Sequence, residues 1–201
     1  MAKKKTIMVS STVYGIEELL EKIYSLLTSF GYEVWMSHKG TIPVLSKKTA
    51  FENCLDAVEK CDLFLGIITP FYGSGTDEKD AISITHMELR KAVELNKLRW
   101  LLSHDHVVFA RNFLKNLGYD TSEKRKALKY KKSDVFGDLR VIDMYEEAIL
   151  SQQPLRDRKG NWVQKFDRDE DAQLFTTAQF SRFQEAEEFI NDNIKKKGGS
   201  K

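Results

Sequence analysis

The sequence has little of what marks a secreted, membrane-spanning or disulfide-bonded protein. Its 201 residues include only two cysteines, Cys54 and Cys61. They stand two turns apart on a helix-like segment, too far for a disulfide and unlike the paired spacing of metal ligands, so we interpret them as buried thiols of a cytoplasmic protein. The first residues, M-A-K-K-K-T, pass into a strand without a long apolar region, so we expect no signal peptide. No apolar run approaches the about 18 residues needed to span a bilayer.

An excess of charge of one sign is also missing. The formal net charge is +2, which offers no case for binding nucleic acid or a membrane. Local basic clusters occur at residues 3–5, 124–132 and 195–197, and we expect them to be solvated tails and surface loops. Hydrophobic residues make up 41% of the chain, a share that excludes wholesale disorder and allows one main folded unit.

Several catalytic signatures are missing as well. The chain contains neither a Walker A loop nor a G-x-G-x-x-G fingerprint, which disfavours phosphate binding by those routes. It has no G-x-S-x-G elbow and no placed Cys/His pair to support nucleophilic hydrolase chemistry. His104, Asp105 and His106 bring two imidazoles and a carboxylate together, but a third ligand at a recognised spacing is missing, so no metal site is expected.

Strands and helices alternate along the first half of the chain. Short apolar strands are predicted at Thr6–Ser11, Tyr32–Met36, Leu63–Thr69 and Leu98–Ser103. Amphipathic helices are predicted at Tyr14–Phe30, at Ala50–Lys60 and from Thr85 onward. This rhythm predicts an α/β fold, a flavodoxin-like, doubly wound and mainly parallel sheet with helices on both faces. The most continuously apolar strand, Leu63–Thr69, is expected at its centre.

Helix starts carry capping signals. Ser11 or Thr12 is placed to cap the first helix, and Thr49 with Glu52 fits a capping box at the second.

The second half of the chain gives weaker patterns. We predict helices at His106–Leu117 and Ala178–Ile194, a polar segment at Thr121–Ser133, a fifth strand at Leu139–Met144 and a hairpin-like turn within Pro154–Phe166. The expected organisation is an α/β domain at 1–150, a C-terminal hairpin and helix at 151–195 packed on it, and a disordered tail at 196–201.

The stretch Ile67–Asn96 is the first candidate for chemistry, because it joins a strand, a glycine-containing loop and a helix. Ligands bind at the carboxyl ends of parallel strands. Glu88, expected in the first turn of the helix, could hold a ribose hydroxyl or stabilise an oxocarbenium-like transition state. Thr85 and Glu88 also fit T-x-x-E, a capping box that needs no substrate, and spacing alone favours that role.

Polar groups from two loops are expected beside Glu88. Tyr72 offers an aromatic face with a hydroxyl, and Gly73 and Gly75 permit close approach of the backbone to a ligand. Ser10, Ser11 and Thr12, at the end of the first strand, should open onto the same edge of the sheet. A simple turn and helix capping would explain these residues equally well.

Four segments of the sequence resemble a known family, a likeness that the spacing of residues alone would not reveal. They read I-M-V-S-S-T-V-Y, F-G-Y-E-V-W-M-S, C-D-L-F-L-G-I-I-T-P-F-Y-G-S-G and S-I-T-H-M-E-L-R-K-A, in that order. Together they resemble the DUF4062 family, which is similar to TIR (Toll/interleukin-1 receptor) domains with a flavodoxin-like sheet. The resemblance spans Thr6 to Leu117, with an outer limit at Ile149, and leaves the tail uncovered. The family label itself names no activity.

The likeness to TIR domains implies an NAD nucleosidase or cyclase. Many bacterial TIR proteins cleave the nicotinamide–ribose bond of NAD with a glutamate on the helix after the third strand, and Glu88 falls on that position. NAD would then be a substrate rather than a cofactor, and the product ADP-ribose or a cyclic isomer. Standalone TIR proteins of Thoeris-type antiphage defence make such a signal, so the implied partners are NAD, further copies in a homo-oligomer and a separate effector protein.

The resulting site hypothesis makes Glu88 catalytic and surrounds it with substrate-binding residues. These are Ser10, Ser11, Thr12, Tyr72, Gly73, Ser74 and His86. Two alternatives stay open. One is a non-catalytic TIR-like scaffold, in which Glu88 is a cap and surface loops recruit a protein partner. The other is a nucleoside deoxyribosyltransferase-like enzyme, which would exchange bases on deoxynucleosides and ignore NAD. The loop Ser37–Lys48 does not match the TIR loop that mediates assembly.

Overall fold

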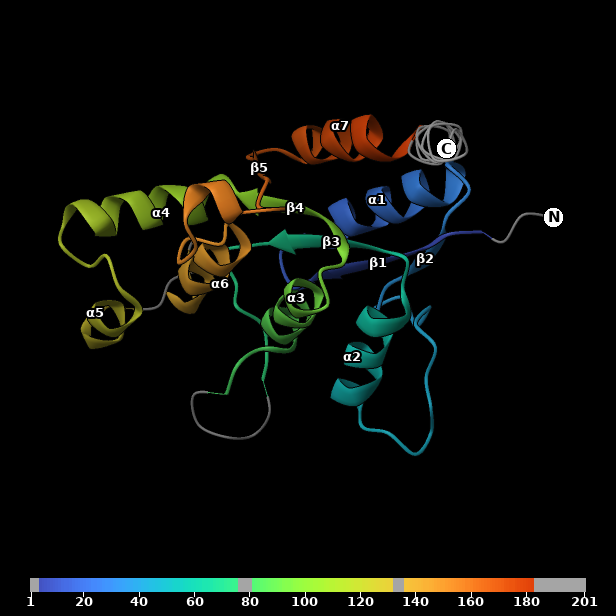
Figure 1. The fold of residues 1–201 in the computed structure, drawn as a ribbon, viewed down its shortest axis with the longest axis horizontal. Coiled ribbons are helices and arrows are strands. Elements are labelled where there is room, and N and C mark those ends of the chain that lie inside the picture. Colours follow the sequence, from blue (N-terminus) through green and yellow to red (C-terminus); the bar gives the residue numbers. More distant parts are fainter. Residues whose placement is uncertain (1–3, 76–80, 132–135, 183–201) are drawn as a thin grey trace, which may run out of the picture.

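A parallel sheet forms the centre of the protein. The computed structural model describes residues 4–75, 81–131 and 136–182. Within these ranges the strands pair in the order β2-β1-β3-β4-β5. They are β1 (Thr6–Ser11), β2 (Glu33–Trp35), β3 (Leu63–Ile68), β4 (Leu98–His104) and β5 (Val163–Phe166). All neighbouring strands run parallel, which confirms the predicted flavodoxin-like fold (Figure 1).

Helices cover both faces of the sheet (Figure 1). On one face, α1 (Glu17–Ser29) packs against α7 (Asp169–Phe180). The other face carries α2 (Ala50–Lys60), α3 (Ile84–Glu94), α4 (Asp105–Asn116) and α6 (Arg140–Ala148). The short α5 (Ser122–Ala127) follows α4, and a 3₁₀ helix, η1 (Leu155–Asp157), precedes β5. Each layer of helices buries its own hydrophobic cluster against the sheet.

Strand β3 lies at the centre of the sheet and is buried along its whole length, as its unbroken apolar run predicted. Gly66 is required there by close packing. A Cβ at this position would lie 2.8 Å from Cδ2 of Leu101 on β4, so a larger residue would force the two strands' side chains apart.

The capping predictions have different outcomes. Thr49 and Glu52 form the predicted capping box at α2, with bonds of 3.2 and 2.7 Å in opposite directions. The box predicted at Thr85 and Glu88 is wrong, because Ser83 caps α3 by accepting a bond from the His86 amide. Glu88 therefore lies in the second turn of α3, where the helix's own carbonyls already satisfy its backbone amide.

The capping prediction for α1 is also wrong. That helix begins at Glu17 after Ile16, which makes no side-chain cap bond. The hydroxyl of Ser11 instead donates to the carbonyls of Thr12 and Ile67, at 3.0 and 3.2 Å.

The largest errors concern the second half of the chain. The strand predicted at Leu139–Met144 is helix α6, whose buried residues Val141, Ile142, Met144 and Ala148 have helical spacing. A short apolar run does not by itself distinguish a buried strand from a buried helix.

The predicted turn before the fifth strand is present at residues 159–160, but the strand, β5, pairs parallel to β4 and so belongs to the main sheet rather than to a hairpin. The helix predicted at Ala178–Ile194 overlaps the end of α7, while its part beyond residue 182 and the tail at 196–201 lie outside the described residues. None of the helices in the described ranges combines the length and hydropathy of a bilayer-crossing segment.

Candidate active site

Glu88 meets Ser10 at the carboxyl edge of the sheet. Ser10 is the penultimate residue of β1 and pairs with Gly66 of β3, while Glu88 comes from α3, the helix that follows β3. The hydroxyl of Ser10 donates a hydrogen bond to the carboxyl of Glu88. Neighbouring strands β1 and β3 lead to helices on opposite faces, so this contact lies at the topological switch point, where such sheets bind ligands.

The carboxyl of Glu88 is in an environment that disfavours its charge. Ser10 is 3% exposed and Glu88 4% exposed. Burial raises the pKa of Glu88 to about 7, although hydrogen bonds with Ser10 and the Cys54 thiol act in the opposite direction. Burial, with the nearby Glu88, raises the pKa of the Cys54 thiol to about 12, so the thiol stays protonated. Near neutral pH, Glu88 can act either as an acid or as a carboxylate.

Two loops cover this edge of the sheet. Thr12 lies against Gly73, where an added Cβ would be 2.9 Å from the Thr12 Oγ1 atom. The ring of Tyr14 packs edge-on against Phe71, with centroids 4.9 Å apart. Gly73 has a φ of +79°, a conformation that favours glycine. These loops leave the ends of β1 and β3, the strands beside the Ser10–Glu88 contact, and Cys54 on α2 bonds the Glu88 carboxyl from another side.

Tyr72 and His86 point away from Glu88. His86 stands two positions before Glu88 on α3, which places its side chain about 200° away around the helix. The hydroxyl of Tyr72 lies 2.7 Å from His86 Nδ1, and His86 Nε2 lies 3.0 Å from the carboxylate of Glu147 on α6. Tyr72 and His86 line a pocket of about 820 Å³ between α3, α5 and α6, and Ser10 and Glu88 are not part of its lining.

The predicted site residues fall into three groups. Ser10 contacts Glu88, and Thr12 and Gly73 belong to the two loops at the same edge of the sheet. Tyr72 and His86 belong to the neighbouring pocket. Ser11 and Ser74 contact the backbone: the Ser11 hydroxyl donates to two carbonyls, and the Ser74 carbonyl accepts a 3.1 Å bond from the amide of Ile84 at the start of α3.

A family match covers almost the whole chain. The family model described as "Domain of unknown function (DUF4062)" matches residues 6–195. The chain belongs to the DUF4062 family. The match extends the resemblance found in the sequence from Leu117 to residue 195, across β5 and α7.

Two solved structures are similar to this DUF4062 protein. A CMP N-glycosidase from Clostridium botulinum, BcmB, shares 14% identity, with a TM-score of 0.44, 85% of this chain and 95% of that chain covered. A 2-desoxiribosyltransferase from Leishmania mexicana shares 18% identity, with a TM-score of 0.40, 71% of this chain and 96% of that chain covered. No curated protein matches the chain.

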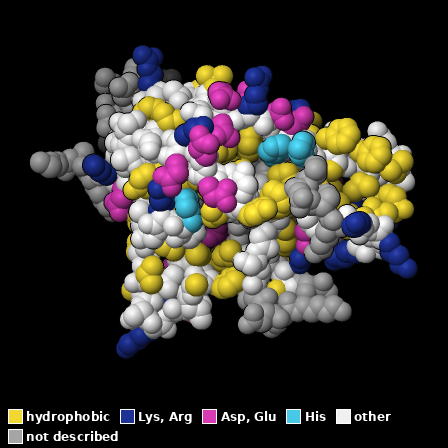
Figure 2. All heavy atoms as spheres, turned by 180° about the vertical axis from the view of Figure 1, so that it is seen from behind, with side chains coloured by type: hydrophobic (Ala, Val, Ile, Leu, Met, Phe, Trp, Pro, Cys, Tyr) yellow, Lys and Arg dark blue, Asp and Glu magenta, His cyan; other side chains and the backbone are white. Residues whose placement is uncertain are grey.

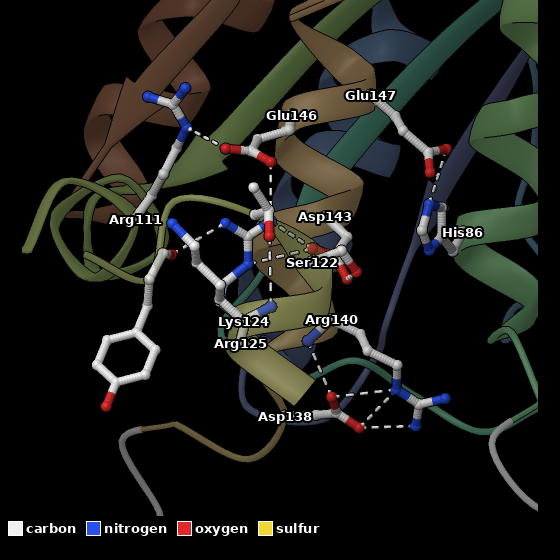
Figure 3. Close-up of polar contacts among 12 residues, drawn as sticks. His86, Arg111, Ser122, Lys124, Arg125, Asp138, Arg140, Asp143, Glu146 and Glu147 are labelled. Atoms are coloured by element: carbon white, nitrogen blue, oxygen red, sulfur yellow. Dashed lines mark hydrogen bonds and ion pairs between the residues drawn. The ribbon is translucent and has the colours of Figure 1, made fainter. Parts of the chain in front are cut away.

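The wall of the pocket in this DUF4062 protein is an ion-pair network that sequence reasoning missed (Figure 3). The buried guanidinium of Arg125 donates to Asp143 at 2.5 Å and to Glu146 at 2.8 Å. Arg111 donates to the other oxygen of Glu146 at 3.1 Å. Burial alone would raise the pKa of Glu147, but hydrogen bonds from Arg90 and His86 lower it to about 2. The network therefore ties α3, α4 and α5 to α6.

The missed residues had a signal in the sequence. Asp143, Glu146 and Glu147 recur at helical spacing, which becomes visible only once residues 140–148 are taken as a helix. Arg125 lies within the basic cluster at 124–132 that was expected to be solvated, and its 4% exposure makes that expectation wrong for this residue. A guanidinium with two carboxylate partners can be buried where a lone lysine cannot.

The histidine pair at 104 and 106 has a local role. The Nδ1 atom of His104 accepts a 3.2 Å bond from the His106 amide and so caps α4. Among the residues that the structure describes, no three His, Cys, Asp or Glu side chains are placed to hold a metal ion.

Proposed function

We propose that this protein cleaves the N-glycosidic bond between nicotinamide and ribose in NAD, with Glu88 as the catalytic carboxylate. The observation that carries the proposal is the Ser10–Glu88 contact at the switch point between β1 and β3. The choice of NAD rests on the TIR resemblance of the segments around Ser10 and Glu88. In this proposal, NAD is the substrate and the product is ADP-ribose or a cyclic isomer that signals to a separate effector in antiphage defence.

The proposed reaction mainly requires stabilisation of the positive charge that develops on the ribose. When the bond at the anomeric carbon breaks, its electron pair leaves with nicotinamide, which becomes neutral, and the ribose takes on oxocarbenium character. A carboxylate at Glu88 stabilises that cation or holds a ribose hydroxyl, and the Ser10 hydroxyl orients the carboxylate. Addition of water, with release of its proton, gives ADP-ribose. Addition of an adenine nitrogen gives the cyclic isomer.

Access to Glu88 is part of the proposal. Glu88 is 4% exposed, and in this proposal the substrate reaches its carboxyl when the loops that meet at Thr12–Gly73 and Tyr14–Phe71 separate. Their return over a bound substrate would exclude water from the ribosyl cation and favour attack by the substrate's own adenine.

A second candidate is base exchange or hydrolysis on a nucleoside or deoxynucleoside. The raised pKa of Glu88, about 7, favours it, because an uncharged nucleobase needs a proton to leave, whereas nicotinamide does not. This reaction uses the same carboxyl and the same edge of the sheet, and differs in its substrate.

The deciding experiment offers NAD and a set of deoxynucleosides in parallel, with and without lysate from phage-infected cells. Released nicotinamide, free bases and nucleotide products are followed by mass spectrometry. We expect nicotinamide from the wild type and none from Glu88→Gln. Glu94→Gln, which changes an exposed glutamate of the same helix, is the matched control and should keep full turnover.

The outcomes separate the candidates. Base exchange without nicotinamide release would favour the second candidate. Equal inertness of wild type and Glu88→Gln toward every substrate, with retained binding of a protein partner, would overturn both and leave the scaffold.

A further inference from the structure

A cavity lies at the amino edge of the sheet, opposite the edge that holds Glu88. Strand β5 first pairs with β4 at Leu101, so within the described residues the start of β4 has no paired strand on that side. The cavity beside it has a volume of about 410 Å³, within the range of about 300–1,000 Å³ for small-molecule sites. We call it the Arg99 pocket. Its lining includes Arg99 and Trp100 from β4, Trp162 and Gln164 from around the start of β5, and Phe175 and Gln179 from α7.

The guanidinium of Arg99 has no carboxylate partner among the described residues. Its two terminal nitrogens donate to backbone carbonyls, to that of Lys97 at 3.3 Å and to that of Lys159 at 2.8 Å. Its Nε–H is shielded from solvent and has no acceptor in the described ranges. Burial lowers the pKa of Arg99, and no carboxylate opposes that shift. A charge that is partly removed from water without a counter-ion is costly, so this guanidinium favours the approach of an anion.

Other arginines of the protein are paired with acidic side chains. Ion pairs with carboxylates are formed by Arg90, Arg111, Arg125 and Arg140. Figure 2 shows basic and acidic side chains intermixed on much of the face that it draws. Hydrogen bonds with Glu147 raise the pKa of Arg90, the reverse of the shift at Arg99. A bound anion would give Arg99 the kind of partner that these arginines already have.

Gly160 fixes the guanidinium in the pocket. Its φ is +66°, a conformation that favours glycine, and a Cβ there would lie 3.1 Å from both Cζ and Nη2 of Arg99. The turn at residues 159–160 also supplies the Lys159 carbonyl that Nη2 binds. Backbone groups therefore position the side chain, and each terminal nitrogen retains a second N–H for a ligand.

Aromatic rings make the rest of the Arg99 pocket suitable for a flat ligand. The indole of Trp162 is 74% exposed, and its Nε1 donates to Gln164 at 3.4 Å. Trp100 and Phe175 add further ring surface to the lining. An exposed indole beside a cation can hold a flat ring by stacking while the cation holds a negative group. The exposed amide of Gln179 offers a donor and an acceptor to the polar edge of such a ring.

We propose that the Arg99 pocket binds a small ligand in which a flat aromatic ring carries an anionic group, a phosphate or a carboxylate. The terminal nitrogens of Arg99 donate to the oxygens of the anion, and the ring stacks on Trp162. A nucleoside monophosphate contains both parts. The pocket and Glu88 lie at opposite edges of the sheet, so the proposal is independent of the chemistry proposed at Glu88.

The first test compares whole ligands with their parts by titration calorimetry on the full chain. Adenosine monophosphate is the phosphate probe and benzoate the carboxylate probe, and the tighter of the two identifies the preferred anion. Adenosine and inorganic phosphate, the separate parts of the first probe, should each bind at least about tenfold more weakly than adenosine monophosphate. Added salt should weaken the binding of both anionic probes.

Variants test the two named contacts. Arg99→Gln should raise the dissociation constant of the tighter probe by about tenfold or more, and Trp162→Ala by about fivefold or more. Arg99→Lys keeps the charge but loses the paired N–H groups, so its affinity should lie between those of the wild type and Arg99→Gln. Arg156→Gln is the matched control, since that side chain is 87% exposed and lies outside the lining, and it should leave the affinity unchanged.

Tryptophan fluorescence places the ligand at the Arg99 pocket. Trp162 is far more exposed than Trp35, which is 8% exposed, so stacking on Trp162 should change the emission of the wild type. Trp162→Phe keeps an aromatic ring at this position. It should therefore bind the probe with an affinity within about threefold of the wild type, but lose the change in emission.

Four results would overturn the proposal. They are no binding of either anionic probe at millimolar concentration, binding of inorganic phosphate as tight as that of adenosine monophosphate, unchanged affinity in Arg99→Gln, and an emission change that persists in Trp162→Phe. If Arg99→Gln fails to fold, Arg99→Lys and Trp162→Ala decide in its place, and unchanged affinity in both would overturn the proposal equally.

Discussion

Ser10 and Glu88 are 78 positions apart in the sequence, yet the hydroxyl of Ser10 donates directly to the carboxyl of Glu88 in the interior of the protein. The contact joins the end of β1 to the second turn of α3 across the switch point of the sheet. Because the pKa of this buried carboxyl is raised, its protonation affects both the pH dependence of folding stability and the proposed chemistry. The contacts around it lead to further measurable consequences.

Glu88→Gln should make the protein more stable at alkaline pH. The folded pKa of Glu88 is about 7 and its ordinary value is 4.5, so between these values the folded protein keeps a proton that the unfolded chain has released. Stability contributed by the protonated carboxyl is thus complete below pH 4.5 and is lost as pH rises through 7. The loss amounts to at most about 3 kcal/mol. Glutamine cannot ionise, so urea unfolding of the variant should lack this dependence. Parallel pH–stability curves for the two proteins would contradict the assignment.

Ser10→Ala should move the pH dependence of NAD cleavage upward. The hydrogen bond from Ser10 lowers the pKa of Glu88, so its removal should let burial raise that pKa further. If turnover needs the carboxylate, the midpoint of the rising limb should shift by about one to two pH units, from the roughly 1.5–3 kcal/mol of a hydrogen bond to a charged group. The pH profile of kcat distinguishes this shift from a uniform loss of activity. Ser11→Ala, whose hydroxyl bonds only backbone carbonyls, should keep the original midpoint.

A disulfide between the covering loops should switch activity off reversibly. A Cβ built at Gly73 lies 3.7 Å from the Cβ of Thr12, within the range for a disulfide. The double variant Thr12→Cys/Gly73→Cys should therefore lose turnover when oxidised and regain it after reduction, since the substrate must part these loops. Gly73 has a positive φ, so the Gly73→Cys single variant is the control for strain. Full activity of the oxidised double variant would show that the substrate does not enter between these loops.

Arg125→Ala should destabilise the protein strongly. Its side chain is 3% exposed and holds Asp143 and Glu146, whose own side chains are 18% and 16% exposed. Truncation leaves two largely buried carboxylates without their common partner, at a cost of about 3 kcal/mol. Lys124 is next to Arg125 in the sequence, and Lys124→Ala, which breaks only an exposed ion pair with Asp120, should cost less than about 0.5 kcal/mol. Chemical denaturation of both variants measures the difference in the free energy of unfolding. Similar decreases in the two variants would mean that the ion-pair network does not stabilise the fold.

Periodicity predicted the first half of the fold well and the second half poorly. Strands β1, β3 and β4 and helix α2 have apolar patterns whose length and spacing allow one interpretation, and they lie within a residue of their predicted bounds. The segment 139–144 allowed two interpretations, because a short apolar run fits either a buried strand or the inner face of a helix. As helix α6, the segment and the residues after it present an acidic face that binds Arg125, which precedes Asp143 by 18 positions and Glu146 by 21.

The site was predictable only in part, for a similar reason. Position in chain order placed Ser10, Thr12, Gly73 and Glu88 at one edge of the sheet, because parallel strands end together. The direction of each side chain around α3 was not available, since it depends on which face of the helix packs against the sheet. In the structure, Glu88 faces Ser10 on β1 and His86 faces Glu147 on α6.

The amino-acid sequence by itself determined the alternation of elements, the buried central strand and the loop edge where Glu88 lies, because those features follow from local hydrophobic periodicity and from the geometry of parallel crossovers. Only the tertiary structure decided that Glu88 is a buried carboxyl bonded to Ser10 rather than a helix cap, and that Arg125 is inside while Phe109 and Phe113 are outside. These outcomes depend on which elements pack against each other, and contacts between distant residues leave no periodic mark in the sequence.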